Sequence, residues 1–138
     1  MQIEINAVPV IKDGHSLIRI TSDVEIMYPT TAGHAKIVQT RGLWDTGATN
    51  TNIRMSTAIA IGIPLGEEIP VTMGASVGQA RRCQFYLRFP SGDVLHISDG
   101  VAVPNMKSSL IIGMDVMSHG LTIIKPDGNG GVNFMFRL

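Results

Sequence analysis

The sequence has little of several features that mark particular classes of protein. Of its 138 residues only Cys83 is a cysteine, which excludes an internal disulfide framework and a cysteine-rich zinc site. Its 11 basic and 11 acidic residues give no formal net charge. Nucleic acids and anionic membrane surfaces, in contrast, bind proteins with an excess of positive charge. No stretch approaches the roughly 20 apolar residues of a membrane span. We therefore expect neither a nucleic acid nor a membrane as a partner.

Signals for export, metals and cofactors are also scarce. Residues 1–10 include Glu4 and lack the basic segment and the long apolar run of a signal peptide. Together with the single cysteine, this predicts a cytoplasmic location. The histidines are scattered, and no two of them are spaced as i and i+4: His15, His34, His96 and His119. We therefore expect no metal site, and we expect no cofactor.

What the sequence does contain is a regular succession of short apolar runs. Hydrophobic residues make up 44% of the chain, and runs rich in Val, Ile, Thr and aromatic residues alternate with Gly, Pro, Asn and Asp. This pattern predicts an all-β barrel or sandwich in a single domain over residues 1–138. The expected strands cover residues 2–8, 16–21, 25–28, 35–39, 42–44, 51–54, 69–73, 79–89, 94–97, 101–103, 109–112, 121–124 and 132–137. Two short helices are expected, one N-capped by Ser56 and running to Ala60, and one over 114–118.

The segment with the clearest chemistry follows one of these strands. An apolar run ends at Trp44 and leads directly into Asp45-Thr46-Gly47. A strand that ends in an acidic residue can hold a carboxylate at the mouth of a β scaffold, and the glycine permits a tight turn there. The tripeptide on its own fits an ordinary strand-to-turn junction equally well.

A second segment changes this interpretation. An apolar strand with Ile111 and Ile112 leads through Gly113 into a short helix that contains Asp115. Leu43 to Ala48 and Ile111 to Asp115 resemble, in that order, the two motifs of the retropepsin family. That family includes the retroviral proteases and their cellular DNA-damage-inducible relatives. A longer segment precedes the aspartate than in viral members, Met114 replaces their arginine, and a further strand follows near the end.

The resemblance implies a retropepsin-like closed barrel with one or two short helices and an aspartic peptidase activity. Asp45 would be catalytic, Thr46 would brace the paired active-site loops, and Gly47 would accept a hydrogen bond from the substrate backbone. The segment between the two motifs would form a β-hairpin flap. The residues expected to bind substrate are Ala48, Thr49, Asn50, Met73, Gly74, Ala75, Ser76, Val77, Gly78 and Ile111. Ile111 could equally be a core residue.

The number of aspartates determines the expected assembly. This chemistry needs one ionised and one protonated aspartate, and two close carboxylates share a proton because they do not ionise together easily. The sequence has one Asp-Thr-Gly, and Asp115 lies in a short helix where it more readily caps or pairs. A homodimer acting on peptide or protein substrates is therefore expected, with closed twofold pairing.

Two other functions remain open at this point. A retropepsin fold could serve as a catalytically silent module that binds peptides or dimerises. A serine hydrolase could be assembled on paper from Ser91, His96 and Asp99, although the sequence has no Gly-x-Ser-x-Gly elbow.

Overall fold

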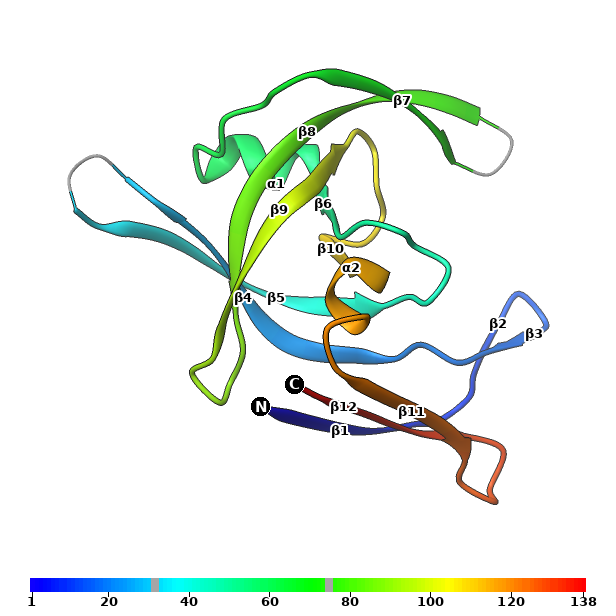
Figure 1. Ribbon diagram of the computed structural model, residues 1–138. Coiled ribbons are helices and arrows are strands. Elements are labelled where there is room, and N and C mark those ends of the chain that lie inside the picture. Colours follow the sequence, from blue (N-terminus) through cyan, green and yellow to red (C-terminus); the bar gives the residue numbers. More distant parts are fainter. Residues whose placement is uncertain (31–32, 74–75) are drawn as a thin grey trace.

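The structure is a computed structural model that describes residues 1–30, 33–73 and 76–138, and the side chains of residues 71–78 lie outside this description. The chain is built mainly from strands, with two short helices (Figure 1). In chain order the elements are β1 (Gln2–Ala7), β2 (Val10–Lys12), β3 (His15–Leu17), β4 (Thr21–Pro29), β5 (Ala35–Trp44), β6 (Asn52–Arg54), α1 (Met55–Ala60), β7 (Glu68–Met73), β8 (Ser76–Arg88), β9 (Val94–Val103), β10 (Leu110–Ile112), α2 (Met114–Met117), β11 (Leu121–Pro126) and β12 (Val132–Arg137).

Six strands form a closed ring of pairings. The largest sheet has the order β4-β5-β10-β6-β9-β8-β7, and β4 also pairs with β8. The series β4-β5-β10-β6-β9-β8 therefore returns to its first strand, as a barrel requires. β7 lies outside the ring and pairs only with β8, so the two strands project as a long hairpin above the barrel (Figure 1). The all-β prediction is confirmed.

A separate three-stranded sheet covers one side of this barrel. Its order is β1-β12-β11, and β1 pairs with β12 from Gln2 opposite Arg137 to Ala7 opposite Val132. The inward-facing residues Phe134 and Phe136 of β12 are buried. This sheet lies below β4 and β5 in Figure 1, with the two chain ends next to each other.

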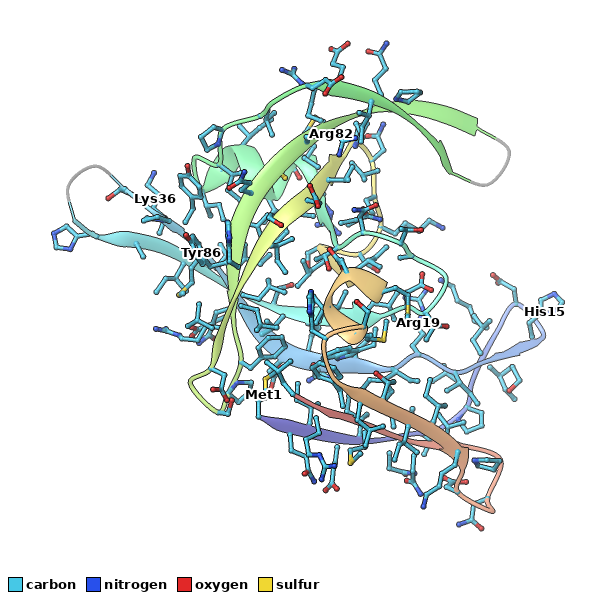
Figure 2. All side chains as sticks on the ribbon, viewed as in Figure 1. Met1, His15, Arg19, Lys36, Arg82 and Tyr86 are labelled. Atoms are coloured by element: carbon cyan, nitrogen blue, oxygen red, sulfur yellow. The ribbon has the colours of Figure 1, made fainter. Side chains whose placement is uncertain are left out.

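Aromatic packing joins the sheet to the barrel. The Trp44 ring, at the end of β5, lies 5.2 Å from the rings of both Phe134 and Phe136 and 6.2 Å from that of Phe89, measured between centroids. The indole Nε1–H donates to Ser22 Oγ at 2.8 Å, so the buried polar atom of the ring is satisfied. Trp44 is thus a core residue, as its position beside an apolar strand favours, and side chains fill the space between the two layers (Figure 2).

Several predicted element boundaries were wrong. Ser56 does not cap the first helix, because α1 begins at Met55 and its N-cap is Arg54, without a side-chain cap hydrogen bond. The strands expected over 35–39 and 42–44 form one strand, β5, because Thr40 and Arg41 stay in the ladder with β4. The strand β2 was not expected. It is only three residues long and is fully exposed.

The helices give one further finding. In the described part of the chain, none of the helices has the length and apolar character needed to cross a bilayer.

The only cysteine of the sequence gives a test of the core. Burial raises the pKa of the Cys83 thiol to about 11, although a backbone hydrogen bond with Ala102 acts in the opposite direction. Because the thiolate is the reactive form, we expect a disulfide reagent at pH 8 to react roughly a hundredfold more slowly with the folded protein than with guanidinium-unfolded protein. The folded state also holds this proton where the unfolded state releases it, so stability should fall as the pH rises from about 9 to 11. Rapid labelling of the native protein would contradict this arrangement.

Candidate active site

Asp45 directly follows β5, one of the six strands of the barrel. In β5, Gly42 to Trp44 pair in parallel with Leu110 to Ile112 of β10. The Asp45 N–H continues this ladder and donates to the Ile112 carbonyl oxygen at 3.0 Å. The two motifs recognised in the sequence are therefore neighbouring strands. Asp45 is the first residue beyond the ladder, so a rigid β scaffold determines where its carboxylate begins.

The turn after the strand holds this carboxylate. The Gly47 N–H donates to Asp45 Oδ1 at 2.8 Å, and the Ala48 N–H donates to the Asp45 carbonyl oxygen at 3.2 Å. The side chain of Asp45 is half-buried, while Thr46 and Gly47 are exposed. An acceptor oriented by a backbone N–H keeps a defined direction.

The helix α2 supports the loop of Asp45 through backbone hydrogen bonds. The Met114 N–H donates to the Ala48 carbonyl oxygen at 2.8 Å, and the Asp115 N–H donates to the Thr49 carbonyl oxygen at 3.1 Å. The approach is close because Gly113 has no side chain. A Cβ atom there would lie 2.6 Å from the Asn50 carbonyl oxygen and 2.7 Å from that of Ala48. Glycine is thus required at this position by contact with backbone atoms.

A buried hydroxyl completes the support. Thr51 is fully buried, and its Oγ1–H donates to Asp115 Oδ1 at 2.7 Å while its Oγ1 accepts from the Gly113 N–H at 3.2 Å. Its backbone N–H donates to Asp115 Oδ2 at 2.9 Å. Asp115 Oδ1 also accepts from the Val116 N–H at 2.9 Å. Both oxygens of Asp115 are therefore occupied, and the residue pairs, as its helical position favoured.

Thr51 was not among the predicted site residues and was expected only as the first residue of a strand over 51–54. One signal was available: Thr51 is a polar residue that directly precedes an apolar strand and lies close in sequence to Asp45. Nothing in the sequence indicated that its hydroxyl would meet Asp115.

The other predicted site residues have mixed surroundings. The Asn50 Nδ2–H donates to the Asp99 carbonyl oxygen at 3.1 Å, so this amide is already bonded within the chain. Ile111 is half-buried and packs against a small cluster that includes Val101 and Val103, in keeping with the alternative that it is a core residue.

The predicted flap corresponds to the hairpin of β7 and β8, in which Met73 pairs with Ser76. Gly74 and Ala75 of its expected tip lie outside the described residues, as do the side chains of Met73, Ser76 and Val77. The pairing of Val71 with Gly78 extends the hairpin to the expected end of the tip.

The residues of the alternative serine hydrolase have other partners. The Ser91 Oγ–H donates to Asp93 Oδ2 at 2.7 Å. The His96 ring stacks on Tyr86 with 4.8 Å between centroids, and Asp99 uses its carbonyl oxygen to accept from Asn50. Within residues 1–30, 33–73 and 76–138, no group of three or more His, Cys, Asp or Glu side chains is arranged to hold a metal ion.

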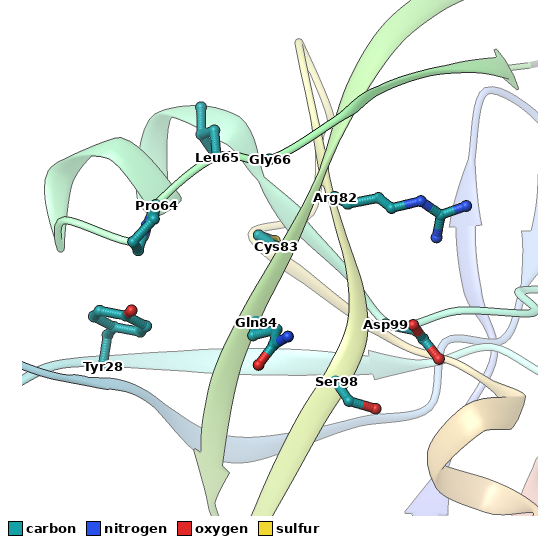
Figure 3. A pocket seen from close by; sticks show the side chains of 9 residues that line it. All are labelled: Tyr28, Pro64, Leu65, Gly66, Arg82, Cys83, Gln84, Ser98 and Asp99. Carbon is teal, nitrogen blue, oxygen red and sulfur yellow. The ribbon is translucent and has the colours of Figure 1, made fainter.

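A cavity of about 410 Å³ has a lining that includes neither Asp45 nor the other residues of its loop (Figure 3). Its described lining comes from β4, β8, β9 and the segment after α1, and includes Tyr28, Leu65, Arg82 and Asp99. Asp99 connects this cavity to the candidate site, because its carbonyl oxygen accepts the hydrogen bond from Asn50. The predicted catalytic residues are not part of this lining.

Comparison with known proteins supports the architecture. No protein-family model matches the sequence, and no curated protein is similar enough to count as a match. Among solved structures, a retropepsin-like aspartic protease from Rickettsia conorii superposes with a TM-score of 0.60, over 99% of this chain and 91% of that one, at 13% sequence identity. The chain has a retropepsin-like fold. The retroviral protease-like domain of Ddi1 from Leishmania major matches with a TM-score of 0.49 and 17% identity, over 86% of this chain and 96% of that one.

The retropepsin-like fold predicted from the two motifs is thus confirmed. At this level of identity the likeness concerns the fold. The roles of individual residues stay predictions that depend on the geometry around Asp45.

The role of Thr51 can be tested with a pair of identical substitutions. Thr51→Val removes the hydroxyl that joins Asp115 to Gly113, so buried groups lose a partner, and we expect a loss of about 2 kcal/mol in the free energy of unfolding. Thr122 is the matched control, because its buried Oγ1 has no hydrogen-bond partner in the described part of the protein. Thr122→Val should be neutral or stabilising. Urea unfolding of the two variants and the wild type gives the comparison, and equal effects would show that Thr51 has no special role.

Proposed function

We propose that the protein is an aspartic endopeptidase that is active as a homodimer. The observation that supports this best is the arrangement of Asp45, whose carboxylate extends from the end of a barrel strand and is oriented by the Gly47 N–H. The loop is held from behind by α2 and by the buried Thr51 hydroxyl. Such support keeps a reacting group in one geometry, which is what hydrolysis by a positioned carboxylate needs.

A second carboxylate has to come from elsewhere. Asp115 is the nearest acidic residue in the two motifs, and both of its oxygens accept hydrogen bonds that support the loop. Using it for catalysis would remove the support of Asp45. A second copy of the chain would supply an equivalent aspartate, Asp45 of the partner subunit, across a twofold axis.

The mechanism follows from the charge of such a pair. Two adjacent carboxylates hold one proton between them, a known property of aspartic proteases. The ionised aspartate would take a proton from a water molecule that attacks the peptide carbonyl, and the protonated aspartate would donate a hydrogen bond to the carbonyl oxygen. The exposed loop residues Thr46 and Gly47 would lie beside the substrate backbone, and no cofactor or metal is needed for these steps.

The proposed setting is the cytoplasm. The single thiol is buried in the core, and the protein therefore gains nothing from an oxidising compartment.

Replacement of Asp45 tests the chemistry. Asp45→Asn keeps the shape of the side chain but cannot act as a general base, so we expect cleavage of a casein-type substrate to fall by a factor of 10² or more, on the order of general-base contributions. Asp23→Asn is the matched control, because Asp23 is an exposed aspartate whose ion pair with Arg41 is itself exposed and contributes little.

Thermal melting and sedimentation of the variant should match the wild type. If the activity of Asp45→Asn stays within tenfold of the wild type, residues other than Asp45 carry out the catalysis. A wild type that binds peptides and cleaves none would instead identify the silent module.

The pH profile tests the shared proton. Activity should be highest at acidic to mildly acidic pH and should disappear at alkaline pH, because both carboxylates are then ionised and no protonated aspartate remains. Initial rates of peptide hydrolysis between pH 3 and 9, with melting temperatures at each pH to exclude unfolding, give the profile. An activity plateau that extends above pH 8 would be inconsistent with a proton-sharing pair.

A further inference from the structure

The hairpin of β2 and β3 is an arm with exposed apolar side chains, and it pairs with no other strand of the described structure. It forms a two-stranded sheet of its own, and all six of its strand residues are exposed. Ile11 is 80% exposed and Val10 61%, and Val8, Leu17 and Ile18 are also exposed. An isolated hairpin is marginally stable in water, and a group of large exposed apolar side chains marks a surface that is covered by a partner.

The base of this arm adjoins the candidate site. The Trp44 N–H donates to the Ile20 carbonyl oxygen at 2.8 Å, and Thr21 pairs with Leu43. The chain that leaves the arm therefore runs beside the last residues of β5, directly before Asp45. In Figure 1 the arm and the loop between β5 and β6 project from the same side of the barrel. Figure 2 shows His15 at the outer end of the arm and Arg19 nearer the barrel, on that side.

A partner protein that binds beside the loop of Asp45 needs a larger contact surface than the loop alone provides. A stable protein interface takes about 20 to 30 residues from each partner, whereas the loop spans residues 45–50, and only Thr46, Gly47 and Thr49 of it are exposed. The arm supplies further surface next to the loop, and this surface includes the exposed apolar side chains of the arm named above. Because the chain has no net charge, two copies meet without overall repulsion.

We propose that the β2–β3 arm docks on a second copy of this chain and holds together the dimer that brings the two Asp45 residues to one site. The proposal rests on the proposed function, since that function requires a second copy beside the loop. A second copy would then both supply the second carboxylate beside Asp45 and cover the exposed apolar side chains of the arm. The arms act reciprocally, as each subunit both extends one and receives one.

The test compares two equivalent substitutions. Ile11→Thr removes apolar surface from the arm and keeps a β-branched residue that favours a strand. Ile37→Thr is the matched control, because Ile37 is an exposed isoleucine of β5, near the end of that strand remote from Asp45. Sedimentation equilibrium measures the dimer dissociation constant, and peptide hydrolysis is measured over a range of protein concentrations.

We expect a wild-type dimer at tens of micromolar, and an increase of about tenfold or more in the dissociation constant for Ile11→Thr, since each dimer loses two buried isoleucines. Ile37→Thr should stay within about twofold of the wild type, in line with a surface change that touches no partner. The specific activity of Ile11→Thr should fall on dilution more steeply than that of the control.

Different results separate the arm from the chemistry. A wild type that stays monomeric, or an Ile11→Thr variant that dimerises as tightly as Ile37→Thr, would overturn the proposed role of the arm, even if the wild type cleaves peptides. If Ile11→Thr weakens the dimer while wild type and Asp45→Asn are equally inactive, the arm is supported and the peptidase is not. Binding of Ile11 to a different protein, with no effect on self-association, would also overturn the proposal.

Discussion

The position of Asp45 depends on one buried hydroxyl, because Thr51 joins the loop that carries the aspartate to a segment much later in the sequence. Thr51 Oγ1 lies between Asp115 Oδ1 and the Gly113 N–H, and no side chain at Gly113 keeps the two backbones apart. The loop is thereby fixed on its inner side and exposed on its outer side. A reacting carboxylate in such a loop is oriented by the fold before any substrate arrives.

The same network limits what one chain can do alone. Asp115 has the chemistry of a second catalytic carboxylate, but it is used to hold the loop. In the proposed peptidase, structural support and catalysis would fall to different aspartates, and the second reacting group would come from another subunit. The surface around the loop agrees with this division, since the β2–β3 arm beside it exposes apolar side chains that its own barrel does not cover.

The predictable parts of this protein are those with a local signal. Asp45 and Gly113 could be singled out because each follows an apolar strand, and the two motifs occur in a characteristic order. Thr51 was missed because its importance comes from a contact with Asp115, and no local pattern encodes such a contact. The β2 strand was missed for the opposite reason. Three exposed residues with no inward face have no alternation to detect.

Helix boundaries failed for a related physical reason. Ser56 is a good N-cap residue by type, but the N-cap lies two residues earlier, at Arg54, because the chain enters the helix directly from β6 with Arg54 in an extended conformation. The Arg54 side chain is engaged elsewhere, since its Nε–H donates to the Met106 carbonyl oxygen at 2.8 Å. Tertiary contacts of this kind override local preference.

The pairing of β1 with β12 has a consequence for how the protein is made. Gln2 lies opposite Arg137, and β10 reaches β5 only after β6 to β9 have been synthesised. Such distant pairings fold slowly, because a long loop of chain must close before they form. β1 thus lacks this pairing until β12 has been synthesised. The supports of Asp45 at Gly113 and Asp115 arrive late as well, so the loop of Asp45 is not organised in a nascent chain before α2 has been made.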